Sequence, residues 1–244
     1  MNDRRELSFD LVADEYERTR PTYPAAILDA LPLDADAAVL DLGAGTGKLT
    51  RVLAERYRDV IAVEPLANMR ALLERSVPAV TALAGSAERI PLDDASVDGV
   101  FAAQAFHWFD KPFALPEIAR VLRPGGVFAI VWNGPDEELP DPRPPEFVRE
   151  VKLIHDAAVM RWKDEPQWED WLRDSGLYVD VHERSFVPHD HVLDRAGIID
   201  NLRSVSWIAS RDDREEVVAR LGALLPDATY AIPNHANVIW ARKA

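Results

Sequence analysis

The sequence of 244 residues contains no cysteine. Disulfide bonds, thiolate nucleophiles and sulfur-ligated metal sites are therefore excluded, and a reducing cytoplasm is compatible with this composition. The sequence also has no uninterrupted apolar run near the ~18 residues of a membrane-spanning helix, and its first residues lack the apolar stretch of a signal peptide. We therefore expect a cytoplasmic protein without a membrane partner.

Positive charge is also in short supply. Lysine and arginine number 28 against 42 aspartates and glutamates, which leaves a net charge of −14. The resulting field repels phosphate backbones and anionic lipids, so we expect a small-molecule partner and no nucleic acid. Metal ligands are sparse too. His189 and His191 flank Asp190 without a compelling third ligand, and we expect no metal.

Short apolar runs alternate with helical patterns from Ala38 to Trp132, separated by Gly, Pro or Asp. This order is typical of repeated βαβ units in an α/β protein, and strands this apolar are covered on both faces of a parallel sheet. The predicted strands are 38–42, 59–64, 79–85, 97–104 and 127–132, and the predicted helices lie near 47–57, 66–75 and 112–122.

The flanking segments differ in character. A charged segment with helical apolar spacing precedes Pro21, and a proline-rich stretch, GPDEELPDPRPPE, follows Asn133. Helical patterns lie near 193–203 and 211–224. The runs 177–187 and 236–243 alternate like strands and are predicted to close the sheet.

The strand at 38–42 runs into three glycines, Gly43, Gly45 and Gly47. Glycines permit a tight turn and a close approach of the backbone to a ligand, at the sheet edge where α/β proteins bind cofactors. Three cofactor classes use this device. Leu42 and Leu49 occupy positions where a phosphate-binding Walker loop needs Gly and Ser or Thr. Lys48 stands where a dinucleotide fingerprint needs Gly, which weakens the nicotinamide alternative without eliminating it.

The segment VLDLGAGTGK resembles the first motif of class I S-adenosylmethionine (SAM)-dependent methyltransferases, (V/L)-L-(D/E)-x-G-x-G-x-G, at Leu40, Asp41 and the three glycines. Glu64 resembles the acid of this family that binds the ribose. The segment 85–88 resembles the one that flanks adenine, and 117–126 resembles the helix and turn before the fifth strand. Together these matches span roughly residues 10–133, and four matches in chain order are far more specific than a lone glycine turn.

The resemblance implies a set of cofactor contacts. The methionine part of SAM would lie at Asp41 and the glycine turn, the ribose at Glu64, and the adenine beside Pro65 and Met69. The full implied set is Tyr16, Arg20, Asp41, Gly43, Ala44, Gly45, Glu64, Pro65, Met69, Ser86, Ala87, Glu88 and Gln104. Family members often have Asp where Ser86 stands, which makes that bond neutral and weaker here.

Substrate contacts are implied by two further patterns. The stretch Y-x-x-x-R-P-x-Y-P resembles the N-terminal lid of the trans-aconitate methyltransferase-like subgroup, and Ser204-Val-Ser206-Trp resembles a stretch of that subgroup that faces its pocket. His107 lies where the family places residues facing the transferred methyl, and histidine suits a general base. A packed core histidine and a solvated arginine remain the alternatives for His107 and Arg20. The implied substrate set is Tyr23, His107, Trp108, Arg203, Ser204 and Ser206.

The implied fold is a three-layer, Rossmann-like class I methyltransferase fold, with a seven-stranded, mostly parallel sheet and an antiparallel last strand. One domain would span 1–244, with a SAM-binding core at 38–133 and a lid at 1–24. Appended helices at 134–176 and 188–225 would roof the substrate pocket.

We expect methyl transfer from SAM to an oxygen (carboxylate or hydroxyl), and less readily to nitrogen or carbon, of a small molecule, leaving S-adenosylhomocysteine (SAH). A monomer or homodimer is expected. The alternatives are a nicotinamide-dependent oxidoreductase and a repurposed, non-catalytic SAM-binding domain.

Overall fold

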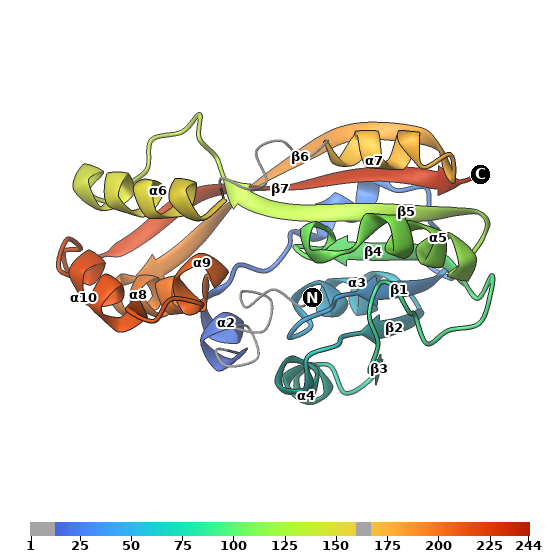
Figure 1. Ribbon diagram of the computed structural model, residues 1–244, viewed down its shortest axis with the longest axis horizontal. Helices are drawn as coiled ribbons and strands as arrows, with labels where there is room; N and C mark the ends of the chain where they lie inside the picture. Colours follow the sequence, from blue (N-terminus) through green and yellow to red (C-terminus); the bar gives the residue numbers. More distant parts are fainter. Residues whose placement is uncertain (1–12, 160–166) are drawn as a thin grey trace. The chain divides into compact units, whose positions relative to one another are not determined.

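Figure 1 shows the chain as a computed structural model, in which residues 13–159 and 167–244 are described. The chain divides into two compact units. We call one the core unit, Thr22–Asn133, Pro166–Val187 and Ala236–Ala244. The other, the appended unit, comprises Met1–Pro21, Gly134–Glu165 and Pro188–His235. Boundaries between the units fall inside strands β5, β6 and β7.

The strands form a seven-stranded sheet with the order β3-β2-β1-β4-β5-β7-β6. Their bounds are β1 Ala38–Leu42, β2 Asp59–Val63, β3 Thr81–Leu83, β4 Val97–Ala103, β5 Leu122–Pro135, β6 Tyr178–Asp194 and β7 Thr229–Lys243. Strands β1 to β5 pair in parallel. Strand β7 runs antiparallel to them and lies between β5 and β6 (Figure 1). The predicted sheet with its antiparallel last strand is therefore confirmed.

Alternation along the strands places side chains on both faces of the core unit's sheet. On β1, Leu40 packs in a cluster with helices α5 (Lys111–Val121) and α7 (Trp168–Asp174). Val39 packs in a second cluster with the 3₁₀ helix η1 (Ala25–Ala30) and helix α3 (Lys48–Arg56). Both faces are thus covered by helices, as the apolar strand sequences predict. Helix α4 (Ala67–Ser76) connects β2 to β3.

The appended unit has a separate apolar cluster. Helices α6 (Pro145–Val159), α8 (Arg195–Ser204), α9 (Ser206–Ala209) and α10 (Arg214–Gly222) contribute to it. Its fully buried members are Phe147, Ile208 and Leu221. Helix α2 (Ala13–Thr19) contacts α8 through an Arg18–Asp200 ion pair at 3.1 Å. Residues 13–21 of the predicted lid are therefore part of this unit, while Thr22 to Pro24 belong to the core unit. Residues 1–12 of the predicted lid lie outside the described residues.

Several element boundaries differ from the predicted ones. Strand β5 begins at Leu122, because the chain pairs with β4 on both sides of a bulge: Leu122 lies opposite Val97 and Val127 opposite Gly99. The Pro-Gly-Gly sequence is thus accommodated inside a strand instead of preceding it. Strand β6 continues to Asp194, so 188–194, predicted as part of the helical roof, is extended. Helix α7, also predicted as roof, belongs to the core unit.

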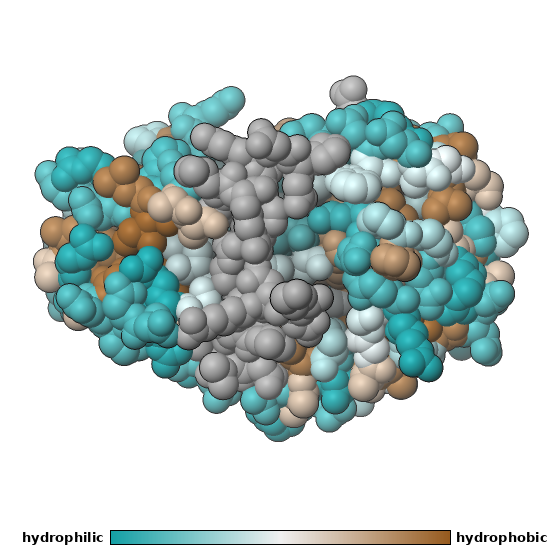
Figure 2. Space-filling view, viewed as in Figure 1, coloured by the Kyte–Doolittle hydropathy of each residue, from teal (hydrophilic) through white to brown (hydrophobic). Residues whose placement is uncertain are grey.

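The surface agrees with the acidic composition. Figure 2 shows hydrophilic residues over most of the described surface in view, with hydrophobic atoms in separate patches. In the part of the chain that the structure describes, the exposed large hydrophobic side chains include Phe113, Leu139, Leu153, Val179, Phe186 and Val192. Within residues 13–159 and 167–244, no helix is long and apolar enough to cross a membrane.

Candidate functional site

The turn between β1 and α3 forms the centre of the candidate site. Gly43 and Gly45 have φ angles of +71° and +57°, in the left-handed region that favours glycine. The amides of Gly43 and Ala44 both donate to the carbonyl of Val63, at 2.8 and 3.1 Å, which ties the turn to the end of β2. A Cβ on Gly45 would meet no atom of the described residues within 4 Å. The turn therefore presents bare backbone where a ligand can approach.

Asp41 is fully buried at the end of β1, one residue before the turn. Its Oδ2 accepts a hydrogen bond from the Thr50 hydroxyl at 2.6 Å. Its Oδ1 is buried and has no hydrogen-bond partner in the part of the chain that the structure describes. Burial raises the pKa of Asp41 to about 7, against the opposing effect of the Thr50 hydrogen bonds. A buried carboxylate oxygen without a donor fits a ligand that brings an ammonium group or another N–H donor.

Glu64 lies directly after β2, and its carboxylate accepts hydrogen bonds from two backbone amides. Its Oε2 accepts from the amide of Gly45 and its Oε1 from the amide of Leu66, both at 2.8 Å. The side chain is 5% exposed, and burial raises the pKa of Glu64 to about 7. A carboxylate has about four acceptor positions, so two remain for the hydroxyls of a ribose.

Arg70 supports this acid and was missed in the sequence analysis. Its Nη1 donates to the Glu64 carbonyl at 2.7 Å, from the first turn of α4. This contact fixes the backbone at the position where the acid leaves the sheet. Its partner is a backbone carbonyl, so no pattern among the side chains of the sequence points to it.

The segment after β3 makes its own contacts. The amide of Arg89 donates to the Ser86 carbonyl at 3.2 Å, and Ala87 is buried. The Glu88 carboxylate accepts from the amide of Asp110 at 3.0 Å, before α5. Of the residues expected beside adenine, Pro65 is exposed and Met69 is buried. Cofactor binding stays a prediction for the five residues expected here, Pro65, Met69, Ser86, Ala87 and Glu88.

Gln104 follows β4 with a φ of +53°, which is uncommon for a residue other than glycine. Its side chain donates to the carbonyl of Asn133 at 2.6 Å, and the Asn133 side chain donates to the carbonyl of Thr22 at 3.1 Å. Asn133, which the sequence analysis did not select, thus links the ends of β4 and β5 to the start of the core unit. The neighbouring Tyr23 is buried in the apolar cluster of η1 and α3.

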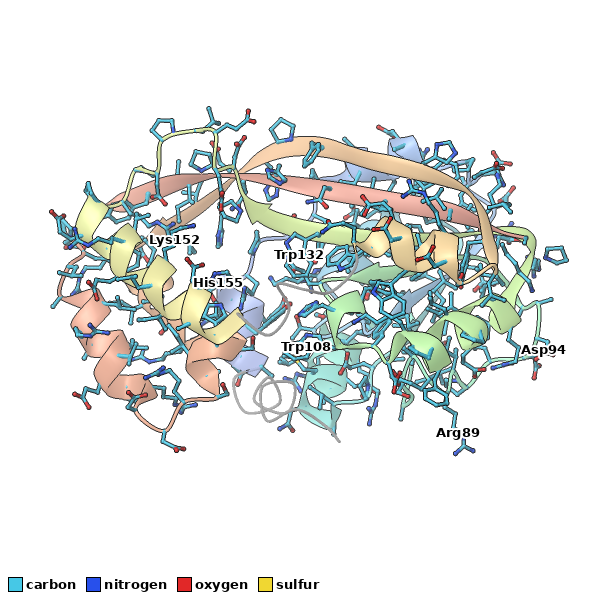
Figure 3. The ribbon with its side chains drawn as sticks, turned by 45° about the horizontal axis from the view of Figure 1, so that its top comes forward. Arg89, Asp94, Trp108, Trp132, Lys152 and His155 are labelled. Atoms are coloured by element: carbon cyan, nitrogen blue, oxygen red, sulfur yellow. The ribbon has the colours of Figure 1, made fainter. Side chains whose placement is uncertain are left out.

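Aromatic rings gather at the same edge. His107 and Trp108 lie in a short 3₁₀ helix, η2 (Phe106–Trp108), and their ring centroids are 4.6 Å apart. The ring of Trp132, near the end of β5, lies 5.1 Å from that of His107 and 5.1 Å from that of Trp168. Figure 3 shows Trp108 and Trp132 at the same end of the core unit's sheet. The predicted His107 and Trp108 are thus brought together with two tryptophans.

The remaining predicted residues lie in the appended unit. Arg20 donates from Nε to the Ser204 hydroxyl at 3.1 Å and from Nη2 to the Ser204 carbonyl at 3.2 Å. Its guanidinium carbon lies 5.3 Å from the centroid of the Tyr16 ring. Arg203 pairs with Asp200 at 3.0 Å and with Glu215 at 3.2 Å. Ser204 is buried, and Ser206 begins α9. Contacts of these residues with cofactor or substrate stay predictions.

Comparisons with known proteins point to one family. A family model described as a methyltransferase domain matches residues 40–130. An uncharacterized methyltransferase of Mycobacterium tuberculosis is 41% identical over 207 residues, which cover 82% of this chain and 85% of that protein.

Two more comparisons extend this result. A malonyl-[acyl-carrier protein] O-methyltransferase of Dechloromonas aromatica is 34% identical over 134 residues, which cover 51% of this chain and 51% of that enzyme. A solved protein of Anaeromyxobacter dehalogenans, assigned as a type II methyltransferase, has a TM-score of 0.59 and 26% identity, covering 92% of this chain and 97% of the other.

Proposed function

The chain belongs to the type 11 family of class I SAM-dependent methyltransferases, and from this we propose that it methylates an oxygen, a carboxylate or a hydroxyl, of a small molecule. SAM is its cofactor and SAH its product. Membership of this family argues against a nicotinamide-dependent oxidoreductase, because the relatives named as enzymes are methyltransferases. The acceptor and its atom are the parts that we propose.

The observation that carries the proposal is the pair of buried acids on either side of the glycine turn. Asp41 offers an unpaired oxygen, and Glu64 holds Gly45 while keeping acceptor positions free. These features fit the ammonium group and the ribose hydroxyls of SAM. The bound cofactor supplies a methyl group on a positively charged sulfur, which is already activated for displacement.

The protein's share of the reaction is alignment and exclusion of water. Asp41, Glu64 and the bare backbone at Gly43 to Gly45 would fix the cofactor at the carboxyl edge of the sheet, beside His107 and Trp108. The cofactor held there would supply its methyl group to the acceptor oxygen, and its sulfur would leave with the electron pair of the broken carbon–sulfur bond. Holding the two reactants in line accounts for most of the acceleration that such a displacement needs.

Oxygen as the acceptor atom is supported by the O-methyltransferase of Dechloromonas aromatica, although the match covers about half of that enzyme. A carboxylate is already a nucleophile and needs no base. A hydroxyl has to lose a proton, and His107 is the residue that we propose as its base, since histidine titrates near neutral pH. Membership of the trans-aconitate-like subgroup is also a proposal, supported by the Tyr16, Arg20 and Ser204 contacts.

The test uses the full chain with SAM carrying a labelled methyl group and a panel of carboxylates, alcohols, amines and activated carbon acids. We expect SAH release that depends on the acceptor, and a labelled product that mild alkali hydrolyses if it is an ester. Asp41→Asn should reduce the release at low SAM concentration by weakening SAM binding. A product labelled on nitrogen or carbon would overturn the choice of oxygen, and SAM binding without any turnover would favour a repurposed binding domain.

A further inference from the structure

The aromatic rings at the edge of the core unit form a continuous surface. We call the rings of His107, Trp108 and Trp132 the aromatic face. The His107 ring lies between the other two, tilted by 43° to Trp108 and edge-on to Trp132 at 76°. All three side chains are half-buried, so each keeps part of its surface accessible. Three rings from two separate strand ends are therefore in contact through His107. Figure 3 shows Trp108 and Trp132 at the same end of the core unit's sheet.

This face lies directly beside the glycine turn. A Cβ added to Gly43 would come within 2.8 Å of the Ala105 Cβ and 3.7 Å of the Phe109 ring. Ala105 and Phe109 immediately flank η2, which carries His107 and Trp108. The turn that holds the cofactor and the turn that holds the aromatic face are therefore in van der Waals contact.

The backbone next to the face is strained. Gln104 adopts a φ of +53° at the end of β4 and is held there by its bonds to Val131 and Asn133. Such conformations persist only where the surroundings enforce them, and they cluster at binding and catalytic sites. The strain here sets the direction in which the chain enters η2.

The orientation of the rings suits a further aromatic ring. Aromatic rings prefer offset or edge-on contacts with one another. The face presents rings at two orientations, since Trp108 is tilted by 43° to His107 and Trp132 lies edge-on to it at 76°. A planar ring placed on the face can therefore make favourable contacts with these rings.

We propose that the aromatic face binds a planar aromatic ring of the methyl acceptor, so that the acceptor is an aromatic carboxylic acid or a phenol. This inference rests on the proposed function, because it places the acceptor's ring beside the cofactor turn. Trp108 and Trp132 are then specificity-determining residues: they select a ring-bearing oxygen acceptor over an aliphatic one of the same charge.

The experiment measures binding of matched ligand pairs to the complex of the full chain with SAH, by calorimetry. The pairs are benzoate with cyclohexanecarboxylate and phenol with cyclohexanol, which differ in the ring and share the oxygen group. We expect the aromatic member to bind about tenfold more tightly, since ring contacts add to the area buried. Trp132→Leu and Trp108→Leu should each reduce this preference about fivefold and leave SAH binding unchanged.

Trp240→Leu is the matched control. Trp240 stacks on His182 at 3.6 Å in the last two strands, so its loss should leave the aromatic preference intact. Equal binding within the pairs would overturn the inference. So would a preference that persists in both the Trp132 and Trp108 variants, or choline displacing benzoate at equal concentration.

Failure of the inference and failure of the proposed function have different outcomes. If aliphatic acids form methyl esters and the ligand pairs show no aromatic preference, the inference is overturned while O-methylation still holds. A clear preference for aromatic rings, with the label found on nitrogen or carbon, would keep the aromatic face and remove oxygen as the acceptor atom.

Discussion

The proposed contact between Asp41 and SAM should make cofactor binding dependent on pH. Burial raises the pKa of Asp41 from 3.8 to about 7, so the folded protein favours the protonated carboxyl group. The contribution of this group to the free energy of unfolding is therefore fully present below pH ~4 and is lost as the pH rises through 7. A cationic ligand prefers the ionised carboxylate, so SAM affinity should increase over the same interval. Asp41→Asn should weaken SAM binding roughly 10- to 100-fold at pH 8, the usual range for a lost hydrogen bond to a charged group.

The measurement is SAM binding by calorimetry between pH 6 and 8, together with thermal unfolding of the free protein. Thr50→Val is the matched variant, because it removes the hydroxyl that lowers the pKa of Asp41 while keeping the side-chain volume. Its affinity profile should move to higher pH. Identical profiles for the parent protein, Asp41→Asn and Thr50→Val would contradict this role of Asp41.

Gly45 permits a test that separates backbone strain from ligand contact. Gly45→Ala and Gly125→Ala both place a Cβ at positive φ, with no atom of residues 13–159 and 167–244 within 4 Å of either Cβ. Each should therefore destabilise the fold by a similar amount, about 1–2 kcal/mol. Only Gly45→Ala should also abolish SAH binding, because its Cβ would occupy the bare surface of the turn. Retention of SAH binding by Gly45→Ala would show that the ligand lies elsewhere.

At the scale of elements, β5 is held by the ring of Phe128. This ring is fully buried, with centroids 5.8 Å from those of both Phe106 and Tyr178. Phe128→Ala should lower the free energy of unfolding by about 3–5 kcal/mol, through lost burial and the cavity left behind. Phe113→Ala, on α5 and 66% exposed, is the control and should change it little. Equal losses in urea unfolding would contradict the packing described for β5.

The elements also show how far the sequence can predict this structure. Asp41 and Glu64 could be found because each ends one of two adjacent parallel strands, β1 and β2, and such ends meet at one sheet edge. Arg70 and Asn133 could not, because their partners are backbone carbonyls, which leave no pattern in the side chains. The lengths of β6 and β7 were underestimated, since Pro188 and Pro233 interrupt the strand pattern at positions that the structure accommodates.

The aromatic face marks a second limit of prediction. The sequence places His107 and Trp108 beside the fourth strand, but Trp132 and Trp168 come from other segments, and ring contacts between them depend on the folded chain. The seven-stranded, mostly parallel sheet with its antiparallel last strand was predictable from the family resemblance. Packing between segments far apart in the sequence was not.

At the scale of the whole molecule, the net charge of −14 acts on the two forms of the cofactor differently. SAM carries a sulfonium, an ammonium and a carboxylate, and is net positive, whereas SAH has lost the sulfonium charge. The acidic field should therefore favour SAM over SAH, and salt should screen this advantage. We expect raising NaCl from ~20 mM to ~500 mM to weaken SAM binding more than SAH binding. Equal salt dependence would show that the field has no influence on the cofactor.

If SAM binds at Asp41 and Glu64 as proposed, its uptake should also change the pH of the solvent, because both buried carboxyl groups have pKa values of about 7. Near neutral pH each group holds a proton for about half of the time, and a bound cation favours the ionised form. SAM uptake should then expel protons and acidify a weakly buffered solution. The binding heat would differ between phosphate and Tris, whose ionisation enthalpies differ, and the difference counts the protons that leave Asp41 and Glu64.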